Sequence, residues 1–251
     1  MMLEVCEIFY SLQGEGRFAG RPSVFLRLGG CNLSCEGFGV EIIKDGKTLI
    51  GCDSIHAVNK EHYRSTWKQY GQGGDLIRDI RASVPNKRPF DIVLTGGEPT
   101  LFYANPVLLE VLEHFVSQGC GVTVETNATV VINFDHYPLY KACTFAMAVK
   151  LSNSLESEER RINHKAIRAI AENSTDSFFK FVLDAAHISG LAREVEVLTQ
   201  GYDVPIYCMP LGESSEVMGQ NDRAVFELCT QKGYCYSDRA HIRVWGKKGG
   251  V

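Results

Sequence analysis

Residues 29–35 read Gly-Gly-Cys-Asn-Leu-Ser-Cys, and the next cysteine, Cys52, follows after a further sixteen residues. Two thiols with three residues between them can face one metal centre from a single tight loop, and the paired glycines let the backbone approach that centre closely. A third thiol can join them only if the intervening chain folds back. Three thiolates suit an iron–sulfur cluster that keeps one iron open for another ligand.

Two other interpretations of this stretch remain open. A zinc ion would need a fourth nitrogen or sulfur ligand, for which His56 is the nearest candidate. Alternatively, the three thiols are unrelated members of a set of nine cysteines, and they bind no metal.

The segment between Cys35 and Cys52 carries a turn signal. Asp45-Gly46 lies between two largely apolar stretches, residues 40–43 and 48–50. Asp-Gly is a preferred pair for the two-residue turn of a β-hairpin. The sequence therefore predicts a hairpin over residues 36–51 that returns Cys52 to the other two thiols.

Composition excludes several classes of protein. The chain has 251 residues, of which 45% are hydrophobic and 22% charged, as expected of a soluble protein with one substantial core. Its net charge of −4 argues against a broad basic surface for nucleic acid. No apolar run approaches the ~20 residues that span a bilayer, and the first ten residues lack the basic start of a signal peptide. Together with the odd number of cysteines, this predicts a cytoplasmic protein that binds neither nucleic acid nor membranes.

Hydrophobic periodicity predicts strands that alternate with helices along most of the chain. Strands are expected at residues 3–12, 23–28, 91–94, 121–125, 145–149, 178–183, 204–209 and 242–245, and helices at residues 75–84, 106–118, 157–173, 188–199 and 222–232. Such alternation is typical of a parallel α/β sheet with right-handed crossovers. Because no linker or repeat interrupts it, we expect a single domain over residues 1–251.

Polar residues gather where the predicted strands end. They are Arg27 beside the cysteine loop, Thr95-Gly96-Gly97-Glu98, Glu125-Thr126-Asn127, Lys150 with Ser152, Asp184 and residues 210–212. Since functional residues collect at the carboxyl ends of parallel strands, this ring predicts a small-molecule site. The Gly-Gly pair would expose backbone groups to a ligand, or it forms only a tight turn.

Taken together, these residues resemble the radical S-adenosylmethionine (SAM) enzymes, and among them the 7-carboxy-7-deazaguanine synthase family. The shared stretches are residues 9–16 (Phe-Tyr-Ser-Leu-Gln-Gly-Glu-Gly), 25–33, 52–54, 95–99 (Thr-Gly-Gly-Glu-Pro), 125–127, 241–245 and 249–251. The resemblance covers nearly the whole chain. It implies a partial, open (β/α)6-type barrel with, in this chain, a β-hairpin insertion in the cluster-binding loop.

The resemblance also implies roles for individual residues. Cys31, Cys35 and Cys52 would hold a [4Fe–4S] cluster whose open iron binds SAM, and Ser54 would bind Mg²⁺ in contact with the substrate carboxylate. The residues that would bind the cofactor are Gly51, Cys52, Asp53, Gly97, Glu98, Glu125, Ala148, Val149 and Lys150. Those that would bind a pterin-like substrate are Leu12, Gln13, Gly14, Glu15, Arg27, Thr95, His241 and Val251.

Three positions depart from the family pattern. The family usually has two residues between its second and third cysteines, where this chain has sixteen. It commonly has threonine at the position of Ser54, which retains a hydroxyl. Where the family often has Ser-Pro-Lys, this chain has Ala148-Val149-Lys150, so a hydroxyl contact would be lost there.

The activity implied by the resemblance is a ring contraction. Reductive cleavage of SAM would give a 5′-deoxyadenosyl radical that takes hydrogen from C6 of 6-carboxy-5,6,7,8-tetrahydropterin, and the product, 7-carboxy-7-deazaguanine, would form with loss of ammonia. This reaction belongs to queuosine-type biosynthesis. The resemblance further implies a homodimer and an electron donor such as flavodoxin.

Two rival functions remain. One is a radical SAM activase that installs a glycyl radical on a partner protein, against which the Gln13-Gly14-Glu15-Gly16 turn argues. The other is a non-catalytic binding module stabilised by zinc. The charged run at residues 156–161 is expected to be a solvated helix start, and His241 is either a substrate contact or a structural histidine.

Overall fold

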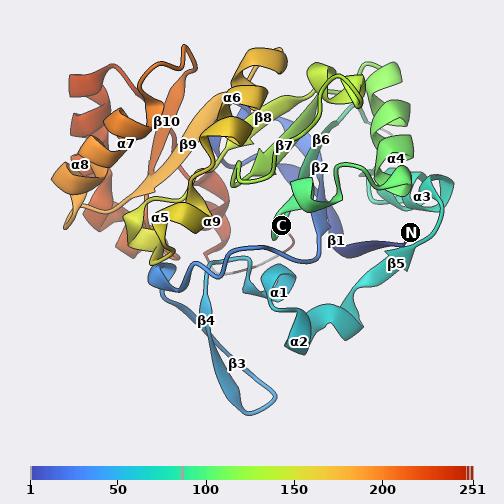
Figure 1. Ribbon diagram of the computed structural model, residues 1–251. Coiled ribbons are helices and arrows are strands. Elements are labelled where there is room, and N and C mark those ends of the chain that lie inside the picture. Colours follow the sequence, from blue (N-terminus) through green and yellow to red (C-terminus); the bar gives the residue numbers. More distant parts are fainter. Residues whose placement is uncertain (1, 86–87, 247, 249, 251) are drawn as a thin grey trace.

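A nine-stranded sheet organises the computed structural model, which describes residues 2–85, 88–246, 248 and 250 (Figure 1). Its order is β11-β10-β9-β8-β7-β6-β2-β1-β5. The strands are β1 (Leu3–Leu12), β2 (Pro22–Leu28), β5 (Lys68–Tyr70), β6 (Asp91–Gly96), β7 (Val122–Thr126), β8 (Thr144–Met147), β9 (Phe178–Leu183), β10 (Ile206–Pro210) and β11 (Cys235–Tyr236). Neighbours from β2 to β11 are parallel, whereas β1 runs antiparallel to β2 and β5.

Helices cover one face of this sheet. Figure 1 shows them around its outer side. They are α3 (Gly73–Ala82), α4 (Pro106–Ser117), α6 (His164–Asn173), α7 (Ile188–Thr199) and α8 (Ser215–Lys232). Within the described residues the sheet ends at β11 and β5 without closing on itself, which is the expected open α/β barrel. No helix among these residues is both long and apolar enough to cross a bilayer.

Successive side chains of a strand point to opposite sides of the sheet, and several polar residues near the strand ends share its inner face. Leu94, Val124 and Phe179 belong to the main hydrophobic core, which includes the helices. The next residue on each strand is Thr95, Glu125 or Lys180, respectively. These polar side chains contact one another through Glu125, and they therefore share the inner face.

Helix α4 shows why the predicted helices form where they do. Asn105 caps it by accepting hydrogen bonds from two backbone N–H groups of the first turn, and Pro106 occupies the first helical position. Leu108, Val111, Leu112 and Phe115 recur at helical spacing, and all four are buried. The helix predicted at residues 106–118 is thus confirmed.

The predicted hairpin is also confirmed. Strands β3 (Val40–Lys44) and β4 (Lys47–Gly51) pair antiparallel in a sheet of their own. The turn residues Asp45 and Gly46 have φ angles of 51° and 76°, as a type I′ turn requires. Figure 1 shows the hairpin projecting from the body of the protein. Two short helices, α1 (Ile55–Val58) and α2 (Lys60–Tyr63), follow it.

One predicted strand is wrong. Residues 242–245 belong to helix α9 (Ala240–Trp245), and the last strand is β11. Periodicity cannot separate a strand from a helical turn in so short an apolar run. Here only Ile242 of that run is buried, whereas Val244 and Trp245 are exposed.

The helix predicted at residues 157–173 is interrupted. It forms α5 (Glu158–Arg161) and α6, and Ile162 and Asn163 between them are extended. The Asn163 side chain accepts hydrogen bonds from Lys165 N and Ala166 N, so it begins a new helix. Asparagine is among the strongest N-cap residues, and its preference for this role outweighs the continuous apolar pattern.

Candidate active site

The cysteine loop follows β2 and lies directly against the Gly96-Gly97 turn. Gly97 N donates to Leu28 O at 3.1 Å, and Glu98 N donates to Gly30 O at 2.8 Å. A Cβ added to Gly97 would lie 2.3 Å from the Gly30 carbonyl oxygen and 2.9 Å from the Cβ of Cys31. The glycine pair is therefore needed for close contact between the two loops and is more than a tight turn.

The three cysteines of the loop influence one another electrostatically. Burial raises the pKa of each thiol to about 11. A negative charge on Cys35 raises the pKa of the Cys31 thiol further. In the same way, Cys52 raises the pKa of Cys35, and Cys31 raises the pKa of Cys52. The Lys150 ammonium lowers the pKa of all three. The end of the hairpin lies against the cysteine loop, because a Cβ added to Gly51 would be 3.3 Å from Ser34 O. That the three thiols hold one cluster stays a prediction.

A zinc ion and an iron–sulfur cluster make different demands on the three thiols. Among the described residues, no three His, Cys, Asp or Glu side chains are placed to hold a single metal ion. Zinc draws its ligands to about 2.0–2.3 Å from one centre, whereas a cube of four irons binds each thiolate at a different iron. The zinc candidate His56 directs its Nε2 at Glu7 Oε1, 3.3 Å away.

Donors already surround the first sulfur. Leu33 N donates to Cys31 Sγ at 3.4 Å, and Asn127 Nδ2 lies 4.0 Å from the same sulfur. Hydrogen bonds and positive charge near the sulfurs favour the thiolate form and tune the potential of a cluster. Together with Lys150, these groups make the loop suitable for thiolate ligands.

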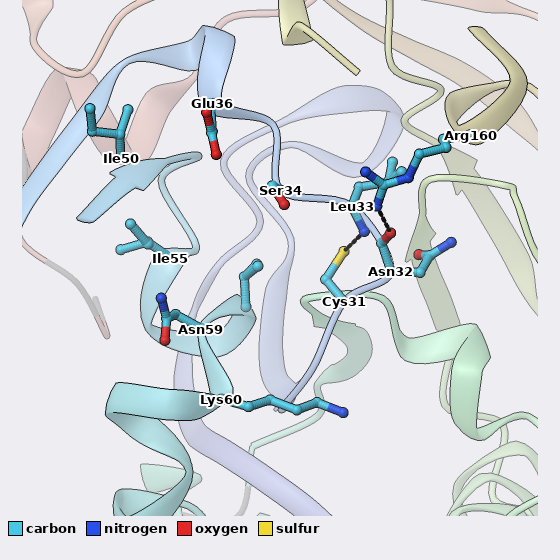
Figure 2. Close-up of a pocket in the computed structure, with 11 residues that line it drawn as sticks. Cys31, Asn32, Leu33, Ser34, Glu36, Ile50, Ile55, Asn59, Lys60 and Arg160 are labelled. Carbon is cyan, nitrogen blue, oxygen red and sulfur yellow. Dashed lines mark hydrogen bonds between the residues drawn. The ribbon is translucent and has the colours of Figure 1, made fainter. Parts of the chain in front are cut away.

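The charged run at residues 156–161 begins helix α5, and residues 157–160 are exposed, as expected of a solvated helix start. Its first residue, Glu156, is buried and also contacts the cysteine loop. Glu156 is 9% exposed and accepts hydrogen bonds from Ser34 N and, at 3.0 Å, from Cys35 N. Arg160 pairs with Glu156 at 3.0 Å and donates to Asn32 O at 2.7 Å, the contact drawn in Figure 2. Buried loop N–H groups need such acceptors.

A pocket of about 360 Å³ adjoins the cysteine loop (Figure 2). Cys31, Leu33 and Ser34 form one wall, and Glu36 and Ile50 of the hairpin contribute to another. Helices α1 and α2 close the remaining side with Ile55 and Lys60. The insertion therefore contributes to the lining of a pocket beside the cysteine loop.

Glu125 is the centre of a polar group on the inner face of the sheet. Its Oε2 accepts a hydrogen bond from Thr95 Oγ1 at 3.0 Å. Its Oε1 accepts from Gln13 Nε2 at 3.3 Å and from Lys180 Nζ at 3.0 Å. Three residues predicted for ligand binding are thus brought together, although they come from three separate segments.

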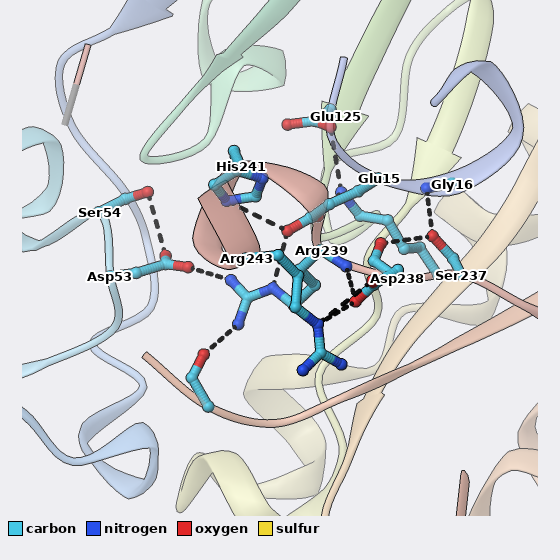
Figure 3. Close-up of polar contacts among 12 residues, drawn as sticks. Glu15, Gly16, Asp53, Ser54, Glu125, Ser237, Asp238, Arg239, His241 and Arg243 are labelled. Carbon is cyan, nitrogen blue, oxygen red and sulfur yellow. Dashed lines mark hydrogen bonds and ion pairs between the residues drawn. The ribbon is translucent and has the colours of Figure 1, made fainter. Parts of the chain in front are cut away.

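Glu15 forms a second centre, shown in Figure 3. Arg239 Nε donates to Glu15 Oε1 at 2.8 Å, and Lys180 Nζ donates to Glu15 Oε2 at 3.0 Å. His241 Nε2 lies 3.7 Å from Glu15 Oε1. Burial acts to raise the pKa of the Glu15 carboxyl, but the charges of Lys180 and Arg239 outweigh it and hold that pKa well below its usual value.

Arg27 and Ser54 lie side by side at the other end of this site. Arg27 Nη1 donates to Ser54 Oγ at 3.1 Å, and its Nε donates to Glu7 Oε1 at 2.6 Å. Ser54 Oγ lies 3.3 Å from Asp53 Oδ1, and Arg239 donates to the other oxygen of Asp53 at 2.7 Å. The whole site is one continuous network, which runs through Arg27, Ser54, Asp53, Arg239, Glu15, Lys180, Glu125 and Thr95.

Comparison with known proteins shows the family of this chain. A family model described as a 4Fe-4S single cluster domain matches residues 12–171. The 7-carboxy-7-deazaguanine synthase of Halobacterium salinarum is 32% identical over 97% of this chain and 90% of its own length. The chain belongs to the 7-carboxy-7-deazaguanine synthase family.

Other members and a solved structure agree with this assignment. The 7-carboxy-7-deazaguanine synthases of Rhodopirellula baltica and Pyrobaculum aerophilum are 27% and 28% identical, each over 99% of this chain and over 89% and 97% of their own lengths. The crystal structure of QueE from Escherichia coli has a TM-score of 0.67 at 21% identity and covers 96% of this chain and 95% of its own. That structural likeness supports the fold of a radical SAM partial barrel.

Glu98, which is predicted to bind the cofactor, makes hydrogen bonds within the protein. Glu98 is fully buried and accepts hydrogen bonds from Thr100, Thr126 Oγ1 and Asn127 N. Burial raises the pKa of its carboxyl above the usual value. Its expected role in binding the cofactor stays a prediction.

The remaining predicted residues surround the same region. Gly14 lies beneath His241, because a Cβ added there would be 2.3 Å from His241 Nδ1. Gly51, which directly precedes Cys52, and Val149 are both buried. Leu12, by contrast, is 54% exposed. Ala148 N donates to Thr126 O at 2.7 Å. Val251 lies outside the described residues.

Two buried cations of the site were missed by sequence reasoning. Lys180 stands alone among apolar residues of β9, and a period of two places it opposite Phe179 and Phe181, which could have marked it. Arg239 gives no comparable signal, since it lies in a polar segment before α9. Both are essential to the network, because each connects two acidic side chains.

Proposed function

We propose that this protein is a 7-carboxy-7-deazaguanine synthase. It converts 6-carboxy-5,6,7,8-tetrahydropterin to 7-carboxy-7-deazaguanine with loss of ammonia, and it is therefore a radical SAM lyase. The observation that carries the proposal is the network from Ser54, two residues after Cys52, to Glu125 on the inner face. It connects the segment after Cys52 to polar side chains that could bind a heterocycle through hydrogen bonds.

Cys31, Cys35 and Cys52 hold the cluster, and Gly97 lets the neighbouring loop approach it. A bound [4Fe–4S] cluster supplies the electron for reductive cleavage of SAM, chemistry that no protein side chain can supply. Lys150 provides positive charge beside all three thiols, which stabilises their thiolate forms. Glu156 fixes the backbone of the loop.

The SAM site is proposed to lie between the cysteine loop and the ends of β6, β7 and β8. Its lining comprises Gly51, Asp53, Gly97, Glu98, Ala148, Val149 and Lys150, whereas we assign Glu125 to the substrate ring. The contact of Gly97 with Cys31 and the position of Lys150 near the thiols support this placement. Val149 would contribute through its backbone, since its side chain belongs to the core.

Arg27 and Ser54 are proposed to bind the carboxylate of the substrate. A guanidinium offers paired donors to a carboxylate, and the Ser54 hydroxyl adds an oxygen ligand for Mg²⁺, which prefers oxygen. The hydrogen bond between the two residues supports a shared role. Binding at this end would orient C6 of the pterin toward the SAM site.

The carboxylates at the other end suit the nitrogen-rich edge of a pterin. Its amide and amino groups are N–H donors, and Glu15 and Glu125 are acceptors. Gln13 and Thr95 already bond to Glu125, and His241 lies close to Glu15. We propose these side chains, with Leu12, Gly14 and Val251, as the binding site for the ring.

The cellular location and the partners of the protein are proposed from its cysteines and from the family resemblance. All nine cysteines are free thiols, which favours the reducing cytosol. The family resemblance favours a homodimer and an electron donor such as flavodoxin. Sedimentation analysis tests the dimer, and reduction of the cluster by a purified flavodoxin tests the donor.

The decisive experiment for the function uses the full chain reconstituted anaerobically with iron and sulfide. It is incubated with carboxytetrahydropterin, SAM, Mg²⁺ and dithionite, and the products are separated by chromatography. We expect 7-carboxy-7-deazaguanine, which forms only when both SAM and the pterin are present. Cleavage of SAM without conversion of the pterin, at any pterin concentration, would contradict the substrate assignment.

A further inference from the structure

Lys180 is a buried charge in the centre of an apolar strand. Its side chain is 9% exposed, and it lies between Phe179 and Phe181 of β9. An ammonium in such a place is strongly unfavourable unless it is paired and hydrogen-bonded. The Nζ atom has two carboxylate partners, Glu15 Oε2 and Glu125 Oε1, each at 3.0 Å.

The two partners of Lys180 come from different parts of the chain. Glu15 lies in the turn after β1, and Glu125 lies near the end of β7. Each carboxylate is fixed by a further donor on its other oxygen, Glu15 by Arg239 at 2.8 Å and Glu125 by Thr95 at 3.0 Å. Lys180 therefore joins two separately anchored acids. Without its charge the two carboxylates would repel each other, and one would be driven toward protonation.

We propose that Lys180 is a positioning residue, whose ammonium holds Glu15 and Glu125 side by side as a pair of ionised acceptors for the N–H groups of the substrate ring. The inference rests on the proposed function, because it takes the pterin as the ligand of the two carboxylates. Lys180 acts through the two acids, and it needs no contact with the substrate.

The electrostatic setting favours positioning over proton transfer. Burial acts to lower the pKa of the Lys180 ammonium, but the charges of Glu125 and Glu15 outweigh it and raise that pKa above its usual value. A lysine with a raised pKa is a poor proton donor at neutral pH. Its charge is thus constant over the working range, which suits a fixed electrostatic role.

Other charged groups also face Glu15 and Glu125, and they remain in place when Lys180 is replaced. Arg239 and His241 approach Glu15 from the segment of α9, and Asp53 acts on it with the opposite sign through its contact with Arg239. Glu125 faces the neutral side chains of Gln13 and Thr95. Removal of Lys180 leaves Glu15 with Arg239 and His241, whereas the remaining hydrogen-bond partners of Glu125 within the described part of the chain, Gln13 and Thr95, are neutral.

The test compares Lys180→Met, which keeps the length of the side chain, with Lys180→Arg, which keeps its charge. In the first arm, carbon-13 NMR of labelled glutamate carboxyls follows titration of the cofactor-free protein. We expect Lys180→Met to shift a carboxyl titration to higher pH, and Lys180→Arg to leave it near its wild-type position. Unchanged titration in Lys180→Met would overturn the inference.

In the second arm, calorimetry measures binding of the pterin to the reconstituted protein with SAM present. Lys180→Met is expected to bind it roughly tenfold or more weakly, the loss typical of one misplaced charged hydrogen bond. Its cluster content and its cleavage of SAM without substrate should stay within about twofold of the wild type. Wild-type affinity in Lys180→Met, or equal loss of all three properties, would also overturn the inference.

A double variant separates positioning from simple destabilisation. Glu125→Gln in the Lys180→Met background removes the unpaired buried charge, so we expect the melting temperature to recover while pterin binding stays weak. Recovery of binding together with stability would show that the lysine only supports the fold. If wild-type protein does not bind the pterin but the titration still shifts, the proposed function fails and the pairing of the two acids by Lys180 stands.

Discussion

The guanidinium of Arg27 donates a hydrogen bond to the hydroxyl of Ser54 over 3.1 Å. Arg27 lies near the end of β2, just before the cysteine loop, and Ser54 lies two residues after Cys52. The contact therefore joins the two ends of the cluster-binding segment. It also places a cation beside the hydroxyl proposed to bind Mg²⁺.

Replacement of Arg27 by alanine is expected to separate SAM cleavage from turnover. The variant retains the cluster and the SAM site, so it should produce 5′-deoxyadenosine in the absence of substrate at close to the wild-type rate. It should lose product formation by roughly a hundredfold, because a carboxylate then lacks a charge-assisted bidentate partner. The control is Arg168→Ala on the exposed face of α6. Product formation at the wild-type level in Arg27→Ala contradicts the assigned role.

Glu156 is expected to stabilise the cluster through the backbone of its loop. In Glu156→Ala the N–H groups of Ser34 and Cys35 lose their acceptor, and an unsatisfied buried group costs about 1–3 kcal/mol. The cluster should therefore be lost several-fold faster to an iron chelator, as followed by absorbance. Glu159→Ala, at an exposed neighbour, is the matched control. Equal rates for the two variants would show that the carboxylate has no such role.

Two glycine-to-alanine changes test the contact between the glycine pair and the cysteine loop. Gly97→Ala should lower both the iron content and the melting temperature, because its Cβ would meet Gly30 O at 2.3 Å. Gly74→Ala has no neighbour within 4 Å and lies in α3, so it should match the wild type or be slightly more stable. Thermal denaturation and iron analysis measure both. A Gly97→Ala protein with normal iron content would refute the need for close approach.

The ion pairs of Glu15 predict a specific dependence of stability on pH. Since the folded pKa of Glu15 is held below its unfolded value of about 4.3, its contribution is present above that value and is lost as pH falls through the folded pKa. Urea unfolding between pH 5 and pH 3 should therefore show a smaller loss of stability in Glu15→Gln than in the wild type. Glu113→Gln, on an exposed position of α4, should behave as the wild type does. Parallel curves for wild type and Glu15→Gln would exclude the proposed linkage.

The parts of the fold set by local sequence could be predicted. Asp45-Gly46 specifies its hairpin because both residues tolerate positive φ, and Asn105-Pro106 specifies the start of α4. Helix α9 could not be predicted from its short apolar run, because its state depends on the contacts of Arg239 with the inner face.

The candidate site shows a similar division. The motifs revealed Cys31, Glu125 and Arg27, since spacing and strand ends mark them. They did not reveal Glu156, whose contacts with the cysteine loop span more than a hundred residues. Lys180 was marked only by its place among apolar residues, and its partners Glu15 and Glu125 lie 165 and 55 residues away. Such long-range contacts are set by tertiary packing and leave little trace in local sequence.

The central claim is that three thiols far apart in sequence hold one cluster with an open iron. Mössbauer spectroscopy of iron-57 protein, reconstituted anaerobically, measures this most directly. We predict a [4Fe–4S] spectrum in which the addition of SAM makes one iron distinct from the other three. The cluster spectrum should be lost in Cys52→Ala and kept in Cys120→Ala. A full cluster signal in Cys52→Ala would contradict the claim.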